Sequence, residues 1–422
     1  MPLSAADRAY LRDLATKIAE IAADPYNAKR RREWYLHNDL KPARPMVLIF
    51  PEGSWSEILP DSDMRIGDPV WRQREWWLRH VIYRWHHLRD DNVIEPVVDA
   101  SPQRGVVGWA LSGGMTARPS GGRGAARYAP DIIDPVEGLK KFTSSRPHLV
   151  VNHEAKQRTL EEMTDVFGGI LEIRWKRSPG INTSLTNHLC YLRGLDQVMI
   201  DMVERPEWLH ELLSFMADCT ETLLDELEAS GELEIMEKSP DYPGSGGTCY
   251  THDLPAPDFA GKVRFKDTWG FAESQEYTGV SPRMLEEFAL RYQVPLVARF
   301  GLNCYGCCED LTTKLDLVIR AMPNLRRISI APWTDVRVAA EKLQGRYIYS
   351  WKPNPACVSN PFDTDHIRAG IRRTFGIARE HGCHIEAILK DTHTCNNHPE
   401  RMTEWVKIAK EEAERAADLV AA

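Results

Sequence analysis

Strand-like and helical segments alternate through the second half of the chain. Short apolar runs bounded by turn residues are each followed by a longer segment with helical periodicity. The expected strands lie at residues 263–267, 297–302, 327–331, 346–350 and 384–389. Alternation of this kind implies a parallel sheet, and it predicts an α/β fold of the (β/α)8 TIM-barrel type. An open doubly wound sheet is the alternative, but no glycine-rich phosphate fingerprint follows an early strand.

The first half of the chain adds a helical extension. Helical periodicity covers about residues 4–34, and a short apolar run at 45–50 reads as the first buried strand. The glycine-, arginine- and serine-rich residues 101–130 are expected to form a long loop or lid, because they cannot build a core. No linker or internal repeat is visible. We therefore predict a helical extension over residues 1–44 and one barrel domain over residues 45–422.

Charge and composition exclude several classes of protein. A net charge of -8 gives no electrostatic argument for binding nucleic acid or an anionic membrane surface. No run of 18 apolar residues could span a membrane, and the charged N-terminal segment does not read as a signal peptide. Nine unevenly spaced cysteines do not describe a disulfide framework, so a reducing cytoplasm is expected.

Polar side chains gather directly after four of the expected strands. In a parallel barrel, groups that follow the strands converge on one face, where barrel enzymes place their active sites. The four polar segments are Lys266–Gln275, Asn303–Glu309, Ser350–Asn354 and Lys390–Asn397. These strand ends are therefore where we expect the functional site.

Two of these polar segments carry cysteine. Cys307 and Cys395 lie far apart in sequence, which excludes a zinc finger or ribbon and suits metal ligands from separate strands. Cys308 stands at the expected start of a helix, where the positive end of the helix dipole favours the thiolate. Cys307 and Cys395 are candidate zinc ligands, with Cys308, Glu309 or His393 as the third. Cys308 could equally be a small buried residue.

Carboxylates and a histidine near the same strand ends could act in catalysis. Asp267 and Asp391 follow expected strands and could serve as a general base or orient a ligand. Asp267 could also cap the next turn. His393 lies close to Cys395 and is a further catalytic candidate. Glu95 closes an early strand, where a carboxylate is either part of a site or half of a salt bridge.

Aromatic and polar residues at the strand ends could hold a ligand. Trp269 and Trp351 stand next to turn residues and could line a pocket for a flat or cationic molecule, although most tryptophans pack in a core. Lys352 could complement a carboxylate on such a ligand. Asn354 follows in the same segment and is a further candidate for binding the ligand.

Three stretches of the chain resemble the uroporphyrinogen decarboxylase superfamily. Asp196–Leu213 (DQVMIDMVERPEWLHELL) resembles a helical segment of that family, and Asp267–Pro282 resembles its D-D-W-G…G…S-P loop and helix start. Tyr305–Glu309 (YGCCE) falls where members have H-x-C-G-N/D. The resemblance covers roughly residues 190–415 well and the preceding residues loosely. It implies a TIM barrel, and because members are often dimers it allows a homodimer.

The resemblance is closer to the zinc-dependent corrinoid methyltransferases than to the decarboxylases. The chain lacks the arginine-rich N-terminal motif of the metal-free decarboxylases. The methyltransferases bind zinc through His-x-Cys after one strand and a Cys after the last. Cys307 and Cys395 match the two cysteines, whereas Tyr305 stands where the histidine should be. Either Glu309, Cys308 or His393 replaces that ligand, or zinc is absent.

The resemblance implies an enzyme that moves a methyl group between a small donor and the cobalt of a partner corrinoid (cobalamin) protein. Zinc would activate the donor or hold an acceptor thiol as thiolate. A methoxyaromatic donor, and hence O-demethylation, is the preferred version. A decarboxylase of tetrapyrrole-like acids and a catalytically silent ligand-binding barrel are the alternatives.

Overall fold

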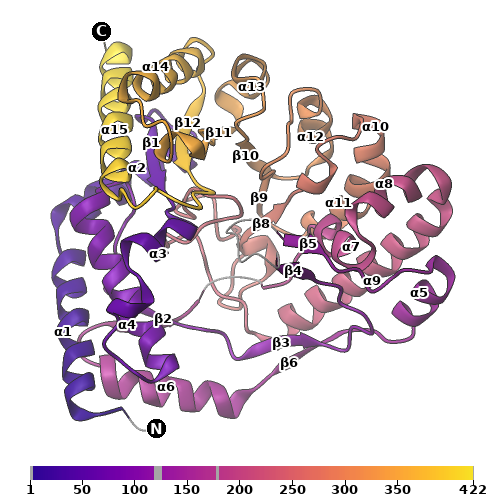
Figure 1. The fold of residues 1–422 in the computed structure, drawn as a ribbon, viewed down its shortest axis with the longest axis horizontal. Coiled ribbons are helices and arrows are strands. Elements are labelled where there is room, and N and C mark those ends of the chain that lie inside the picture. Colours follow the sequence, from indigo (N-terminus) through magenta and orange to yellow (C-terminus); the bar gives the residue numbers. More distant parts are fainter. Residues whose placement is uncertain (1–2, 118–125, 177–179, 422) are drawn as a thin grey trace. The chain divides into compact units, whose positions relative to one another are not determined.

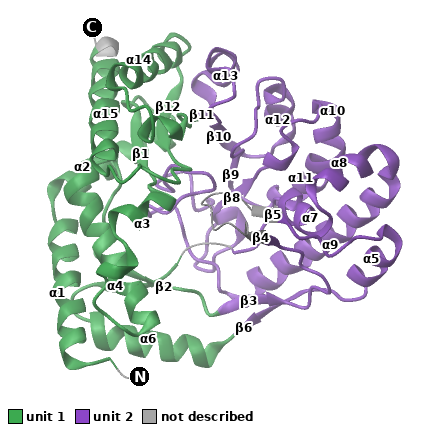
Figure 2. Ribbon diagram, viewed as in Figure 1, with its two compact units in different colours: residues 1–103, 152–176, 350–422 green, residues 104–151, 177–349 purple. Residues whose placement is uncertain are grey.

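The computed structural model describes residues 3–117, 126–176 and 180–421. Figure 1 labels the helices and strands along the chain. The chain divides into two compact units, each built from separate segments (Figure 2). Unit 1 comprises residues 1–103, 152–176 and 350–422, and unit 2 comprises residues 104–151 and 177–349. The expected boundary at residue 44 falls inside unit 1, and the single barrel domain stays a prediction.

Parallel strand pairs organise unit 1. β1 (Met46–Ile49) pairs in parallel with β12 (His384–Leu389), and every residue of β1 is buried. β2 (Val97–Ala100) pairs in parallel with β7 (Glu172–Trp175). β11 (Ile348–Trp351) is the strand in which the division between the units falls. The continuous apolar sequence of β1 is typical of a parallel strand that is covered on both faces.

Helices surround these strands within unit 1. They are α1 (Ala5–Ala22), α2 (Pro25–Asn38), α3 (Trp55–Ile58), α4 (Pro69–Tyr83), α6 (His153–Phe167), α14 (Thr364–Glu380) and α15 (Glu400–Ala421). α1 packs on α4 and α6 through an apolar cluster that includes Leu11, Leu78 and Phe167. The helical pattern expected at 4–34 is present as two helices, because Asp24 caps a new helix whose first residue is Pro25.

Strands and helices alternate in unit 2. β8 (Trp269–Ala272), β9 (Leu302–Tyr305) and β10 (Leu325–Ile330) are parallel and lie in the order β8-β9-β10. The helices of unit 2 are α5 (Pro135–Phe142), α7 (Leu185–Arg193), α8 (Leu195–Glu204), α9 (Pro206–Ser230), α10 (Pro282–Leu285), α11 (Arg291–Val297), α12 (Leu315–Ala321) and α13 (Val336–Leu343). Helices connect each of these strands to the next, so the parallel α/β architecture is confirmed. Closure into an eight-stranded barrel stays a prediction.

Two expected strands in this region are wrong in position. Residues Phe265–Asp267 form a 3-10 turn, and the strand begins at Trp269 instead. The apolar run at 297–302 belongs partly to α11, and β9 begins only at Leu302. A short apolar run fits a buried helix and a buried strand equally well, so the sequence alone could not separate them.

The segment at 101–130, expected to be a loop, contains strands where it is described. β3 (Arg104–Val107) pairs antiparallel with β6 (His148–Val151), and β4 (Met115–Ala117) pairs antiparallel with β5 (Ala126–Tyr128). Residues 118–125 of the expected lid lie outside the described residues.

Two expectations from composition can be compared with the structure. No helix in the described ranges is long and apolar enough to cross a membrane. None of the nine cysteines, all of which lie in the described ranges, forms a disulfide.

Candidate functional site

The carboxyl ends of β8 and β9 bring acids and thiols together in unit 2. Glu273 directly follows β8, and Cys307 follows β9 after one glycine. The backbone N–H of Gly306 donates to the carbonyl of Ala272 at 2.9 Å, which ties the two strand ends together. Parallel neighbours end at the same edge of a sheet, so Glu273 and Cys307 lie at one edge.

The turn after β9 places two sulfur atoms side by side. Gly306 has a φ of 94°, and a Cβ atom there would lie 3.1 Å from the carbonyl oxygen of Ser329. Side chains of successive residues point to opposite faces in an extended strand. The bend after Gly306 instead leaves the Sγ atoms of Cys307 and Cys308 3.5 Å apart. Both cysteines are partly exposed.

Glu309 holds this turn in place. One carboxylate oxygen accepts the N–H of Cys307 at 2.7 Å, and the other accepts the N–H of Ser274 at 3.1 Å. The Ser329 hydroxyl donates to the carbonyl of Cys307 at 3.3 Å. Burial raises the pKa of Glu309, although the N–H groups oppose the shift. The carboxylate of Glu309, a candidate metal ligand, therefore joins the two strand ends by binding a backbone N–H group of each.

Glu273 is a buried acid at the same edge. Its side chain accepts one hydrogen bond, from the N–H of Gln275 at 3.2 Å, and the residue is 7% exposed. Burial raises the pKa of Glu273 to about 9, and the neighbouring Glu276, Glu309 and Cys307 add to the shift. Glu273 is therefore a neutral carboxylic acid at pH 7. A strongly shifted carboxyl group at a strand end is typical of functional sites.

Tyr305, in place of the expected histidine, is part of the interior. It is the last residue of β9 and is fully buried. Burial raises the pKa of Tyr305 well above its usual value, and Glu309 and Glu273 add to this. The phenol therefore keeps its proton at neutral pH.

Glu57 binds the loop after β12 in unit 1. It accepts hydrogen bonds from the Thr394 hydroxyl at 2.6 Å, the Cys395 thiol at 3.1 Å, and the N–H groups of Cys395 and Asn397 at 3.0 and 2.8 Å. Partial burial raises the pKa of Glu57, but these hydrogen bonds outweigh it and hold the value at about 2. Burial raises the pKa of the Cys395 thiol to about 11, and Glu57 adds to the shift.

We expect Glu57→Ala to make Cys395 at least tenfold more reactive toward a thiol reagent. Hydrogen bonds to a charged group contribute roughly 1.5–3 kcal/mol each, and 1.4 kcal/mol is a factor of ten in opening the loop. The measurement is the labelling rate of the peptide that contains Cys395, read by mass spectrometry. Glu162→Ala, an exposed glutamate of α6, is the matched control. An unchanged labelling rate would show that Glu57 does not hold the loop.

Two predicted catalytic acids have structural partners. Asp267 precedes β8 and lies at its amino end, opposite Glu273. Its carboxylate accepts hydrogen bonds from the N–H groups of Ala256 and Arg264 and from the Arg264 guanidinium, so it closes the turn before β8 and does not cap the next turn. Glu95 pairs with Arg174 at 2.9 Å, as the salt-bridge alternative anticipated.

The two tryptophans predicted to line a pocket pack within the protein. Trp269 is buried in the core of unit 2, and its indole N–H donates to the carbonyl of Cys249 at 3.0 Å. Trp351 is 8% exposed, and its ring meets that of Phe375 edge-on at 6.4 Å. Both therefore fit the core packing that the sequence allowed as the alternative.

Lys352 joins a buried polar chain in unit 1. Its ammonium donates to the Ser350 hydroxyl at 2.6 Å, and that hydroxyl donates to Glu386 at 2.5 Å. The other oxygen of Glu386 lies 3.1 Å from Nε2 of His37. This chain accounts for a lysine that is only 3% exposed. This chain of contacts could not be read from the sequence, because its members come from three separate segments.

The remaining predicted residues of unit 1 lie on the loops. Asn354 accepts the N–H of Ala356 at 3.0 Å and so caps a 3-10 turn. His393 is exposed. Asp391 has a φ of 60° and lies 3.4 Å from the ammonium of Lys390. Their roles in binding or catalysis stay predictions.

Sequence reasoning missed Glu273 and Glu57. Glu273 stands inside the polar segment Lys266–Gln275, but the expected strand was placed six residues early. A strand ending at Ala272 would have pointed to Glu273 directly. Glu57 gave no signal, because its partners lie more than 300 residues away in the chain.

Comparison with solved structures finds similar chains. The chain is similar to a methyltransferase from Methanosarcina mazei, with a TM-score of 0.46 and 9% sequence identity over 90% of this chain and 98% of that chain. No protein-family model and no curated protein matches the chain. The similarity is too low to support an activity, so membership of the uroporphyrinogen decarboxylase superfamily stays a prediction.

The donor atoms suit a soft metal in part. Two ligand sulfurs on one tetrahedral zinc lie about 3.8 Å apart, given Zn–S bonds of about 2.3 Å. The sulfurs of Cys307 and Cys308 are 3.5 Å apart, close to that spacing. Within the described ranges, no group of three or more His, Cys, Asp or Glu residues is already arranged to hold a metal. Cys395 belongs to unit 1, so its joint coordination with Cys307 stays a prediction.

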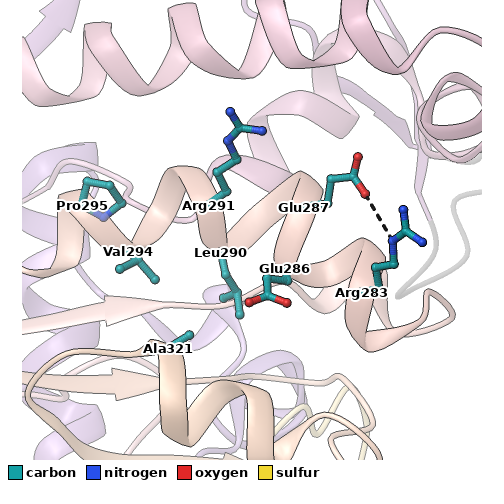
Figure 3. Close-up of a pocket in the computed structure, with 8 residues that line it drawn as sticks. All are labelled: Arg283, Glu286, Glu287, Leu290, Arg291, Val294, Pro295 and Ala321. Carbon is teal, nitrogen blue, oxygen red and sulfur yellow. Dashed lines mark ion pairs between the residues drawn. The ribbon is translucent and has the colours of Figure 1, made fainter.

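A surface groove lies elsewhere on unit 2. It has a volume of about 520 Å³ and is lined by Arg283, Glu286, Glu287, Leu290, Arg291, Val294, Pro295 and Ala321 (Figure 3). Arg283 and Glu287 form an ion pair of 4.0 Å at its rim. None of the predicted site residues lines this groove.

Proposed function

We propose that the protein is a zinc-dependent methyltransferase that moves a methyl group between a small methylated donor and a partner corrinoid protein. The observation that carries the proposal is the thiol pair of Cys307 and Cys308 beside the neutral acid Glu273. Active sites of parallel α/β proteins occur at the carboxyl ends of their strands, where these groups lie. The sequence resemblance supports the same reaction class.

Each residue has a distinct part in the proposed reaction. Cys307 and Cys395 would hold the zinc ion, which supplies Lewis acidity toward a donor heteroatom or keeps an acceptor thiol as thiolate. Glu309 keeps the Cys307 backbone fixed through its carboxylate. Glu273 holds a proton at the same edge of the sheet. A methoxyaromatic is the preferred donor.

Metal content tests the proposal first. We expect about one zinc per chain in the purified protein and less than a tenth of that in Cys307→Ser and Cys395→Ser. Cys357→Ser is the matched control, since Cys357 is a partly exposed cysteine outside the proposed site. Elemental analysis by mass spectrometry gives the count. A metal-free wild-type protein would favour the decarboxylase or the silent barrel, which a decarboxylation assay separates.

Methyl transfer tests the reaction itself. Methylcobalamin and a small thiol serve as donor and acceptor, and loss of the methylcobalamin absorbance reports turnover. Cys307→Ser should reduce the rate at least tenfold, and Cys357→Ser should leave it unchanged. Equal rates in Cys307→Ser and the wild-type protein would contradict the proposed function.

A further inference from the structure

We propose that Cys307 and Cys308 bind one soft metal ion together, as a two-sulfur chelate contained within unit 2. The inference deepens the proposed function and rests on it for the biological role of the metal. It assigns Cys308 as the ligand that replaces the histidine expected at Tyr305. The chelate leaves the remaining coordination positions of the ion open to a substrate atom.

The spacing of the sulfurs is the first argument. They lie 3.5 Å apart, within a few tenths of an ångström of the value of about 3.8 Å for two sulfurs on one tetrahedral ion. Adjacent cysteines in regular strand would point to opposite faces. The positive φ of Gly306 ends the strand geometry immediately before the pair.

The rigidity of the turn is the second argument. Glu309 and Ser329 hold the N–H and the carbonyl of Cys307, respectively. Two residues after the pair, the N–H of Asp310 donates to the Thr278 hydroxyl at 3.0 Å. The backbone on both sides of the two sulfurs is therefore fixed before any metal binds. Such preorganisation lowers the entropic cost of chelation.

The charge around the pair is the third argument. Glu273, Glu276 and Glu309 surround this edge, and none of them forms an ion pair with lysine or arginine in the described part of the chain. The nearby ammonium of Lys314 donates instead to the carbonyls of Tyr277 and Thr278. A cation bound by the thiols would therefore lie among acidic side chains that no lysine or arginine of the described residues pairs with.

A disulfide between the two cysteines is a poor alternative. Cα atoms of adjacent residues are about 3.8 Å apart, whereas disulfides prefer about 4.4–6.8 Å. A bond between these sulfurs would be strained and easily reduced. The dithiol is therefore the favoured state of the pair, and the dithiol is the state that binds a soft ion.

Cadmium titration of the metal-free protein tests the chelate. Cd²⁺ bound to thiolates absorbs in the near ultraviolet, with an intensity that rises with the number of sulfur ligands. We expect Cys308→Ser to lose between a third and a half of this absorbance and to bind Cd²⁺ at least tenfold more weakly. Cys357→Ser should match the wild-type protein. Full absorbance and affinity in Cys308→Ser would overturn the inference.

A dithiol reagent tests the unmodified protein. Phenylarsine oxide forms two As–S bonds with a close pair of thiols, and its oxygen leaves as water with both thiol protons while arsenic stays trivalent. We expect one arsenical per chain on the peptide that carries Cys307 and Cys308, removed by a dithiol and not by a monothiol. An arsenical found on other cysteines only, or none at all, would overturn the inference.

The outcomes separate this inference from the proposed function. Chelation by both cysteines without methyl transfer would leave the inference standing and remove the function. If methyl transfer and zinc binding are lost in Cys395→Ser but retained in Cys308→Ser, the proposed function stands and the chelate by Cys307 and Cys308 is ruled out.

Discussion

Glu273→Gln is expected to stabilise the metal-free protein more at pH 8 than at pH 5. Between these two pH values, the free energy of unfolding of the variant should rise by about 4 kcal/mol relative to that of the wild-type protein. The folded protein holds Glu273 at a pKa of about 9, against an ordinary value of 4.5. Between these values, the folded state binds one proton more than the unfolded state. Stability is therefore lost as the pH rises through this range, at about 1.4 kcal/mol per pH unit.

Glutamine has nearly the same shape but does not titrate, so the variant lacks this loss. Urea unfolding at pH 5, 6.5 and 8 measures the difference in the free energy of unfolding between the two proteins. Glu211→Gln, an exposed residue of α9, is the matched control and should follow the wild-type curve. A difference that does not grow with pH would mean that Glu273 is ionised in the folded protein.

We expect Asp201→Ala to destabilise the protein by about 3–5 kcal/mol. Asp201 of α8 is fully buried, and its carboxylate lies 2.7 Å from Nε of Arg193 at the end of α7. Arg193 is itself buried and also donates to the carbonyls of Ile132 and Ile133. Without Asp201, the guanidinium remains in the interior with no carboxylate to balance its charge.

The midpoint of urea unfolding should fall accordingly. The matched control is Asp196→Ala, which removes an exposed aspartate from the same helix and should change stability by less than about 1 kcal/mol. If Asp201→Ala lowers the free energy of unfolding no more than this control does, water must solvate the guanidinium of Arg193 once the carboxylate is removed.

The local pattern of the sequence was a good guide to element type. The strand expected at 384–389 is β12, and the helix expected to start at Ser281-Pro282 begins there as α10. Helix caps and prolines act on residues a few positions away, so helix ends can be predicted from the sequence. The apolar run at 297–302 was misplaced because its assignment depends on what covers it.

The candidate site was predictable in region but not in detail. The polar segments after β8 and β9 were identified from the alternation of elements, and Cys307 and Cys308 with them. The hydrogen bonds from the N–H groups of Cys307 and Ser274 to Glu309 were not predicted, because strand pairing brings Ser274 near Glu309. The same holds for Cys395, whose thiol meets a glutamate from the other end of the chain.

The sequence by itself determined the parallel α/β order of elements and the edge at which thiols and acids gather. Only the tertiary structure decided that two adjacent sulfurs face each other and that Glu273 keeps its proton. Hydrophobic periodicity and helix capping depend on residues close together in the sequence. The burial of a carboxyl group and its electrostatic environment depend on strands and helices that are far apart in the chain.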